Sequence, residues 1–320
     1  MGAAAVGAIQ FVHAPVAPRP FAQIVPDVQP SANAFGTSKE VRLRFGLPGA
    51  AVAFPLAVFG DPTTLSYEWV ARGDTTPVDR ARPLTDSTVV APNRPGYYQL
   101  VLLHRPDGSP GRSVKEIVAE PSLAVMVPFG DMENGLLNGY HIGTYLAERL
   151  GSGYDRPAGF LQVMPGDVDL SVSRHFRLGD FVTHDRQADV WPKYVALSPR
   201  LLDKLELVVA EIERRRGAVP DDSLSLDVHS GFRTPAHNAE VQRAARDSRH
   251  QYGDAADVVI DANRDGRITR IDSRLVASAV DSVEQHHPDL VGGLGLYTSG
   301  RYRTPYVHID VRGRRSRWQG

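Results

Sequence analysis

Two short segments in the C-terminal part of the chain constrain its fold more than any other feature. Residues 248–257 contain His250 and Asp257, and residues 306–310 contain His308. Two imidazoles and one carboxylate form the ligand set of a catalytic zinc ion that keeps one coordination position for water. A fold that uses this set has to bring the two distant segments together, and we therefore predict His250, Asp257 and His308 as ligands of Zn²⁺.

The first segment predicts a turn that leads into a strand. Gly253 permits a tight turn, and the small residues Ala255 and Ala256 follow it directly before Asp257. The two ligands of this segment are seven residues apart, which is too far for neighbouring turns of one helix. We therefore expect His250 on a loop and Asp257 at the start of a strand, with its side chain pointing inward.

The second segment predicts a strand that carries the third ligand. His308 lies in a run of β-branched residues, and alternate side chains of a strand share a face. His308 and Asp310 should therefore project to the same side. Taken singly, such residues are more often a core histidine and a helix-capping aspartate, but their combined spacing and context favour a metal site.

The rest of the chain divides by composition into three parts. Its 320 residues, of which 42% are hydrophobic, suffice for two domains with separate cores. Residues 1–36 are rich in Pro and Ala and predict an extended segment. Residues 37–125 alternate in short runs between turn residues, as in a small β-sandwich. Residues 126–320 mix strands with helices, which predicts an α+β domain.

Particular elements can be placed in both domains. In the first, alternating runs predict strands at 65–70 and 97–102, and Trp69 with Tyr97 or Tyr98 resembles the aromatic pattern of immunoglobulin-like sandwiches. In the second, apolar residues at helical spacing predict a helix from Ser198 to about Gly217. Further elements are expected as strands at 224–228, 258–260 and 306–311 and as a helix at 273–283.

The zinc segment resembles the M15 family of zinc D,D-peptidases. The family pattern Ser-x-His-x-x-Gly-x-Ala-x-Asp is matched from Ser248 to Asp257, and a Val-His-x-Asp context surrounds His308. The resemblance covers roughly residues 130–318 and is strongest to the branch with murein endopeptidase K and D-alanyl-D-alanine carboxypeptidase-like proteins. It implies a hedgehog/DD-peptidase fold and zinc-dependent hydrolysis of amide bonds in peptidoglycan peptides, as a D,D-carboxypeptidase or an endopeptidase.

The resemblance also implies catalytic roles, with one departure from the family pattern. Arg233 matches a family segment and would hold a substrate carboxylate or the oxyanion, unless it pairs with a structural acid. Many M15 enzymes carry a catalytic Glu three residues before the second histidine ligand, where this chain has Pro305. Asp310 is the first candidate for the general base, and orienting His308 is its equally supported alternative role. Asp254 is the second candidate, with a solvated position as its alternative.

A calcium loop is predicted directly after the zinc segment. Residues 261–272 place oxygen-bearing side chains at positions 1, 3 and 5, Gly266 at position 6 and an acid at position 12. The alternative is an Asp/Asn/Gly turn without a metal. Calcium bound here would steady the connection between Asp257 and the following helix. The predicted Ca²⁺ ligands are Asp261, Asn263, Asp265, the backbone carbonyl of Arg267, and Asp272.

Composition excludes several chemistries and partners. The absence of cysteine excludes disulfides and a cysteine nucleophile, and the net charge of −1 gives no argument for nucleic-acid binding. No stretch approaches the about 18 apolar residues of a membrane span. The first nine residues are small and apolar without a basic region, so they are either the remnant of a signal peptide or a flexible tail.

Together these features predict a zinc metallopeptidase of the cell envelope, periplasmic or secreted, whose partner is a peptidoglycan peptide. One alternative is a non-catalytic, metal-stabilised cell-wall-binding module, which the missing Glu favours. Another keeps the peptidase chemistry but takes an ordinary protein or peptide as substrate. The oligomeric state stays open.

Calcium should stabilise the native protein if the loop binds it. A ligand that binds only the native state stabilises it by about 2.7 kcal/mol at a hundred times its Kd. We expect Ca²⁺ to raise the melting temperature of the chelator-treated protein and Asp261→Ala to abolish this increase, as measured by differential scanning calorimetry. A titration that leaves the wild-type melting temperature unchanged removes the calcium site.

Overall fold

The computed structural model describes residues 10–12, 35–53, 57–59, 65–84, 88–104, 114–117, 123–151, 154–217, 226–298 and 304–320. These residues belong to two compact units. Unit 1 contains Arg42–Val127 and the described residues up to Phe35, whereas unit 2 contains Gly36–Val41 and Pro128–Gly320. The short segment Gly36–Val41, which lies between the two parts of unit 1 in the chain, thus belongs to unit 2. Most of the extended segment predicted for residues 1–36 lies outside the described residues.

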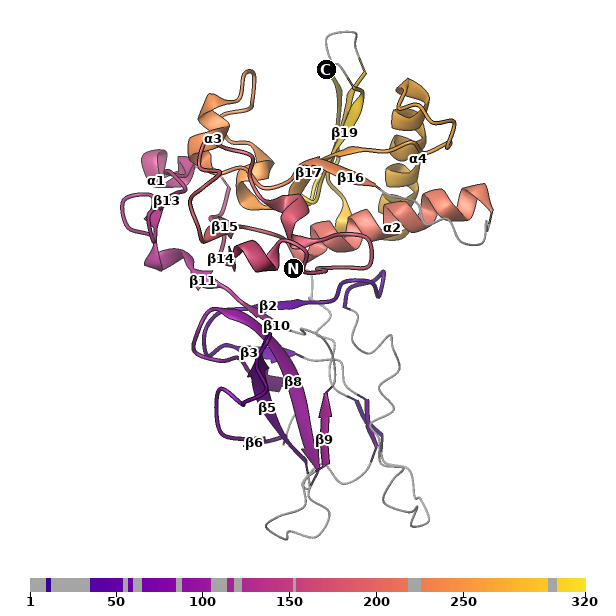
Figure 1. Ribbon diagram of the computed structural model, residues 1–320. Helices are drawn as coiled ribbons and strands as arrows, with labels where there is room; N and C mark the ends of the chain where they lie inside the picture. The colour runs from indigo at the N-terminus through magenta and orange to yellow at the C-terminus, as the bar shows by residue number, and fades with distance from the viewer. Residues whose placement is uncertain are drawn as a thin grey trace. The chain divides into compact units, whose positions relative to one another are not determined.

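Both units together give a mixed α/β chain with several sheets and few helices, compatible with the predicted α+β class (Figure 1). Unit 1 consists of strands in its described part. Its main sheet has the order β2 (Arg44–Gly46), β10 (Leu123–Val125), β8 (Gly96–His104), β5 (Leu65–Ala71) and β6 (Arg82–Pro83), and β9 (Val114–Ile117) also pairs with β8. Two smaller sheets pair β3 (Ala51–Ala53) with β7 (Thr88–Val90) and β1 (Gln10–Val12) with β4 (Ala57–Phe59).

Buried aromatic side chains connect the sheets of unit 1. Nε1 of Trp69 on β5 donates to the carbonyl oxygen of Val90 on β7 at 2.8 Å, and the Tyr67 hydroxyl accepts from the Val90 N–H at 2.9 Å. The Tyr98 hydroxyl donates to the carbonyl oxygen of Arg94, four residues earlier, at 2.8 Å. The contact of Tyr98 is of the kind found in immunoglobulin-like sandwiches, and that assignment stays a prediction.

Unit 2 is built around a five-stranded sheet. Its order is β16 (Asp227–Ser230), β17 (Ala255–Val259), β19 (Tyr306–Asp310), β18 (Gly293–Tyr297) and β20 (Ser316–Gln319), and all pairs are antiparallel except β18 with β20. The helices are α1 (Leu146–Leu150), α2 (Pro199–Arg216), α3 (Pro235–Glu240) and α4 (Arg270–His286). The remaining strands are β11 (Val127–Pro128), β12 (Leu136–Leu137), β13 (Tyr140–His141), β14 (Gly159–Val163) and β15 (Lys193–Val195). Single 3₁₀ turns are η4 (Phe129–Asp131), η5 (Pro165–Asp167), η6 (Leu178–Phe181), η7 (Arg249–Tyr252) and η8 (Pro288–Leu290).

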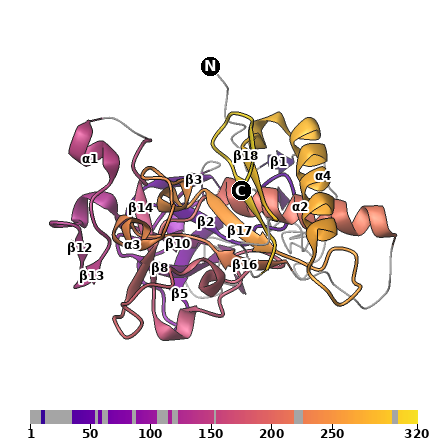
Figure 2. The same ribbon diagram turned by 90° about the horizontal axis from the view of Figure 1, so that it is seen from above.

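Helices α2 and α4 pack against each other, and α4 also packs on β18 and β19 (Figures 1 and 2). Helix α2 begins after Ser198, as predicted, because Pro199 suits the first helical position, and it ends before Gly217. Its apolar stripe is buried, which confirms the helical spacing seen in the sequence. The buried apolar residues of α2 are Leu201, Leu202, Leu205, Val208, Val209 and Ile212.

Several predicted elements differ from the observed ones. The strand predicted at 258–260 is β17, which spans Ala255–Val259, so Asp257 lies inside the strand and not at its start. The predicted helix 273–283 is longer at both ends, because Thr269 and Asp272 form a capping box that starts α4 at Arg270. His250, expected on a loop, lies in the short 3₁₀ helix η7. The strand predicted at 224–228 is described from Asp227 onward, and its first residues lie outside the described part.

A buried lysine ties both helices to the strand β19. Lys204 on α2 has no exposed side-chain surface; its Nζ donates to Oε1 of Glu284 on α4 at 2.7 Å and to the carbonyl oxygen of Asp310 at 2.8 Å. Burial lowers the pKa of Lys204, while the hydrogen bond with Glu284 acts in the opposite direction. Arg317 on β20 also donates to Glu284. The position of β19 therefore depends on an ion pair inside the core.

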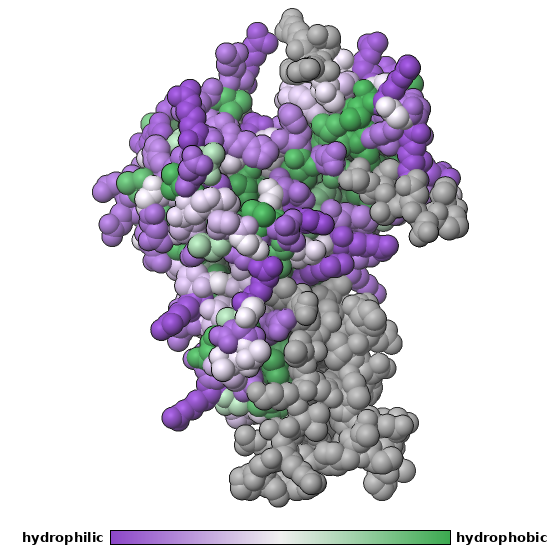
Figure 3. Space-filling model, in the orientation of Figure 1, coloured by the Kyte–Doolittle hydropathy of each residue, from purple (hydrophilic) through white to green (hydrophobic). Residues whose placement is uncertain are grey.

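The described helices include no candidate for a membrane span. None of the described helices is both long enough and apolar enough to cross a membrane. Hydrophilic side chains cover most of the face of unit 2 that Figure 3 shows.

Replacing Lys204 should destabilise unit 2 strongly. Lys204→Met removes the lysine partner of the Glu284 carboxylate and a donor to the Asp310 carbonyl in the core, at a cost of at most about 3–5 kcal/mol, because Arg317 still donates to Glu284. Urea unfolding followed by tryptophan fluorescence measures the change, and Lys39→Met, at an exposed position, is the control. Equal stability of the two variants would show that the ion pair contributes little.

Candidate metal centre

The three predicted ligands meet on the main sheet of unit 2. Asp257 on β17 and His308 on β19 are direct cross-strand partners, and His250 comes from η7, just before β17. Nε2 of His250 lies 3.1 Å from Nδ1 of His308 and 3.2 Å from Oδ1 of Asp257, and the last two atoms are 2.9 Å apart. All three side chains are buried, with relative exposures of 2% for His250, 5% for Asp257 and 7% for His308.

Each imidazole has an inner nitrogen, which faces the other two ligands, and an outer nitrogen, which faces away from them. The hydrogen-bond partners of the outer nitrogens show what the inner nitrogens can bind. Nδ1 of His250 lies 2.7 Å from the carbonyl oxygen of Gly231, and Nε2 of His308 lies 3.1 Å from Oδ2 of Asp310. Since a carbonyl and a carboxylate only accept hydrogen bonds, each outer nitrogen carries the proton of a neutral ring. The inner nitrogens therefore present lone pairs toward each other and toward the Asp257 oxygen.

Three lone pairs at such distances repel one another unless a cation lies among them. Ligand atoms 2.0–2.1 Å from a tetrahedral zinc ion are about 3.4 Å apart, close to the separations seen here. Among the residues that the structure describes, this is the only group of three or more His, Cys, Asp or Glu side chains that could hold a metal ion. The donor set fits a divalent metal and is compatible with zinc.

Two glycines make room for this arrangement. Gly253 has φ +69°, and a Cβ there would lie 2.1 Å from the carbonyl oxygen of Ala196, so only glycine closes the turn between η7 and β17. Gly295 pairs with His308 across the strands, and a Cβ there would lie 2.4 Å from the indole of Trp318. This indole packs beside the His308 ring, with centroids 5.2 Å apart.

The pKa values of the three side chains are shifted in different directions. Burial lowers the pKa of His250. Burial also acts to lower the pKa of His308, but hydrogen bonds with Asp257 and Asp310 outweigh it, so this pKa is raised. Burial would raise the pKa of Asp257, yet the two histidines hold it well below its ordinary value. Without a metal, the first proton therefore goes to His308 while Asp257 stays ionised.

Arg233 lies beside the ligands and bonds directly to one of them. Its Nη2 donates to Oδ2 of Asp257 at 2.6 Å, and its Nε donates to the Ser230 hydroxyl at 2.8 Å. The bond leaves Oδ1 of Asp257 facing the histidines. The Arg233 side chain is 15% exposed and lines the cleft in front of the ligands, so it both orients a ligand and reaches the cleft.

Asp310 and Asp254 are both engaged in ways that disfavour a base role. Asp310 is fully buried on the outer side of the His308 ring, where it accepts from the Gly293 N–H at 2.7 Å and from the Arg312 guanidinium. Burial would raise its pKa, but His308 and Arg312 lower it. A base has to reach the reacting proton, so the geometry favours the orienting role of Asp310. Asp254 is 7% exposed, not solvated, and pairs with Arg249.

The cleft in front of the ligands has a volume of about 670 Å³ and cationic walls. Four arginines line it against two carboxylates, those of Asp257 and Asp247. The motif analysis missed Asp247, although it directly precedes Ser248 at the start of the motif. Tyr297 and Tyr306 form a stacked pair, with centroids 4.5 Å apart, along the same cleft. The four arginines are Arg233, Arg243, Arg249 and Arg312.

The predicted calcium loop connects β17 with α4. The Asp261 carboxylate accepts from the Asp265 N–H at 3.2 Å and the Gly266 N–H at 2.8 Å, while Asp272 accepts from Asn263 and Thr269. These acids close the loop and cap α4, and they do not form a metal-ligand group of the kind described above. Calcium binding stays a prediction.

Comparisons of the chain with models of known protein families, with curated proteins and with solved structures find no match. What the site does has to be inferred from its own geometry and from the sequence motifs.

Removing the charge of Asp310 should weaken metal binding. Partners of ligand histidines contribute about 10–100-fold to metal affinity. We expect wild-type protein to bind one Zn²⁺ per chain and Asp310→Asn to bind it 10–100-fold more weakly in isothermal titration calorimetry. Asp281→Asn, which removes a carboxylate outside the cleft, is the control. Equal affinities of Asp310→Asn and wild type would show that Asp310 does not support His308.

Zinc affinity should also depend on pH in a defined direction. Because the pKa of His308 is raised, this ring is protonated below that pKa and has to release its proton before it binds zinc. Affinity should fall as the pH decreases through that pKa, starting above the ordinary histidine value of about 6.5. Calorimetry in buffers of different ionisation enthalpy measures the released proton, and binding without proton release would contradict this assignment.

Proposed function

We propose that this chain is a zinc-dependent peptidase that hydrolyses amide bonds in bacterial peptidoglycan peptides, as a D,D-carboxypeptidase or an endopeptidase. The convergence of His250, Asp257 and His308 at the base of a cleft carries the proposal. These residues would hold the zinc ion, which, when bound, lowers the pKa of water to about 7 and polarises a carbonyl group.

The surroundings of the ligands support a peptide substrate with negative charge. Three of the four cleft arginines are paired with carboxylates, Arg233 with Asp257, Arg249 with Asp254 and Arg312 with Asp310. Arg243 is exposed at the same cleft and supplies a cation that favours ligands with carboxylates. Arg233, held by Ser230 and Asp257, still has exposed surface toward the cleft. Its guanidinium can bind a substrate carboxylate or stabilise negative charge on the carbonyl oxygen. The peptidoglycan substrate and a location in the cell envelope follow from the M15-like motif.

The general base in this proposal is Asp247. Of the two carboxylates that line the cleft, Asp257 is a ligand, whereas Asp247 bonds through Oδ1 to the Tyr252 hydroxyl. Burial and the bond with Asp247 raise the pKa of Tyr252, so this tyrosine stays protonated and donates. The Tyr252 hydroxyl thereby fixes the Asp247 carboxylate at the cleft, where it can accept a proton from the attacking water.

A second candidate function is a non-catalytic cell-wall-binding module that the metal stabilises. Two observations favour it. Pro305 occupies the position of the family's catalytic Glu, and Asp310 lies on the outer side of the His308 ring, where it cannot reach water at the metal. A module of this kind would use the cationic cleft to bind peptide carboxylates without cleaving them.

Cleavage of purified muropeptides separates the two functions. Zinc-loaded wild type should release shortened or separated peptides, as detected by liquid chromatography with mass spectrometry. A chelator should abolish the activity, added Zn²⁺ should restore it, and His250→Ala should lack it. Stoichiometric zinc without cleavage of any muropeptide would support the binding module.

Asp247→Asn tests the general base independently of metal binding. A positioned base contributes about 10²–10⁴-fold to the rate. We expect kcat to fall by at least a hundredfold while the zinc content and KM remain near wild type. Asp289→Asn, at an exposed position outside the cleft, should leave both constants unchanged. Wild-type kcat in Asp247→Asn would exclude Asp247 as the base.

A further inference from the structure

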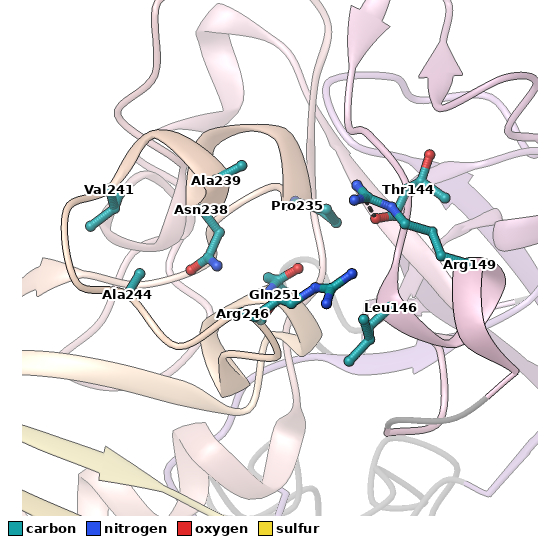
Figure 4. A pocket seen from close by; sticks show the side chains of 10 residues that line it. All are labelled: Thr144, Leu146, Arg149, Pro235, Asn238, Ala239, Val241, Ala244, Arg246 and Gln251. Carbon is teal, nitrogen blue, oxygen red and sulfur yellow. Dashed lines mark hydrogen bonds between the residues drawn. The ribbon is translucent and has the colours of Figure 1, made fainter.

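Unit 2 has a second pocket, whose lining side chains Figure 4 shows. It has a volume of about 240 Å³ and is lined by residues of α1, α3, η7 and the segment 241–246. Val241 and Ala244 line both the pocket and the cleft, so the two hollows share one wall. The pocket and the cleft are therefore neighbours, and a ligand that fills both has to span the segment between them.

The pocket is cationic without an internal counter-charge. Arg149 on α1 and Arg246 are exposed and line it, and no carboxylate does so. The acids close to the pocket in sequence are engaged elsewhere: Glu148 accepts from the Tyr145 N–H at 2.7 Å, Glu240 pairs with Arg186, and Asp247 accepts from the Tyr252 hydroxyl at the cleft. Two guanidinium groups at one small pocket favour an anionic group, to which arginine donates several hydrogen bonds at once.

The pocket also contains a buried acceptor that lacks a donor. Asn238 on α3 is 5% exposed, and its Nδ2 donates to the carbonyl oxygen of Ala245 at 3.0 Å, but its Oδ1 has no hydrogen-bond partner. An unsatisfied buried acceptor costs about 1–3 kcal/mol. A ligand N–H in the pocket would remove that cost.

We propose that this pocket binds the carboxyl-terminal residue of one peptide arm of the substrate. Its carboxylate would bond to Arg149 and Arg246, and its amide N–H would donate to Oδ1 of Asn238. The volume lies below the about 300–1,000 Å³ of pockets for drug-sized ligands, which suits a single residue. This inference rests on the proposed function, because the rest of the substrate would lie in the cleft of the metal centre.

The test compares two otherwise identical cross-linked peptidoglycan peptides, one with a free carboxyl terminus on the arm that is not cleaved and one with that terminus amidated. Wild type should prefer the free carboxylate by about tenfold in kcat/KM, mainly through KM, because the contact binds ground state and transition state alike. The variant with both Arg149→Ala and Arg246→Ala should lose this preference and keep its kcat. Both arginines are exposed, so the variant should fold.

Arg274→Ala, which removes an exposed arginine outside both hollows, is the matched control and should keep the preference. Binding of the same two peptides to the chelator-treated full chain, measured by calorimetry, makes the test independent of cleavage. Tighter binding of the free carboxylate with no cleavage would overturn the proposed function and leave the pocket assigned. Equal use of both peptides by wild type, or a preference that survives in the double variant, would overturn the pocket assignment.

Discussion

Three lone pairs that point at one another in a buried site define the centre of unit 2. The proton of each imidazole is held on its outer side, so the inner nitrogens of His250 and His308 and an oxygen of Asp257 face one another without a donor between them. Bare acceptors in a protein interior are unfavourable. A cation resolves the conflict, and the surrounding fold can be understood as a support for this arrangement.

The support extends outward in steps. Gly231 and Asp310 orient the two imidazoles, and Arg233 orients the carboxylate. Arg312 and the Gly293 N–H fix Asp310 in turn. Each partner is charged or belongs to the backbone, so small rotations of the ligands break good hydrogen bonds. This preorganisation is what a metal site needs to keep an open coordination position for chemistry.

The segment 241–246 lies between the cleft and the second pocket. Residues of this segment line both the cleft and the second pocket, the one that Arg149 and Arg246 also line. Cationic side chains line both hollows, although the whole chain has a net charge of only −1. Three of the cleft arginines are paired with buried carboxylates, whereas Arg243 at the cleft and Arg149 and Arg246 at the pocket are exposed.

Much of this site could be predicted from local patterns. The apolar spacing of α2, the alternation that puts His308 and Asp310 on one face, and the turn at Gly253 all follow from backbone periodicity and sterics, which act over a few residues. Those rules also identify the three ligands, since their residue types and contexts are local. Only the tertiary structure decided which way each ligand faces and that Asp310 lies on the outer side of the His308 ring. It also decided that Asp247 lines the cleft and that Arg149 and Arg246 line the neighbouring pocket. Such facts depend on how distant strands pair and how side chains pack, and these long-range contacts leave no periodic trace in the sequence.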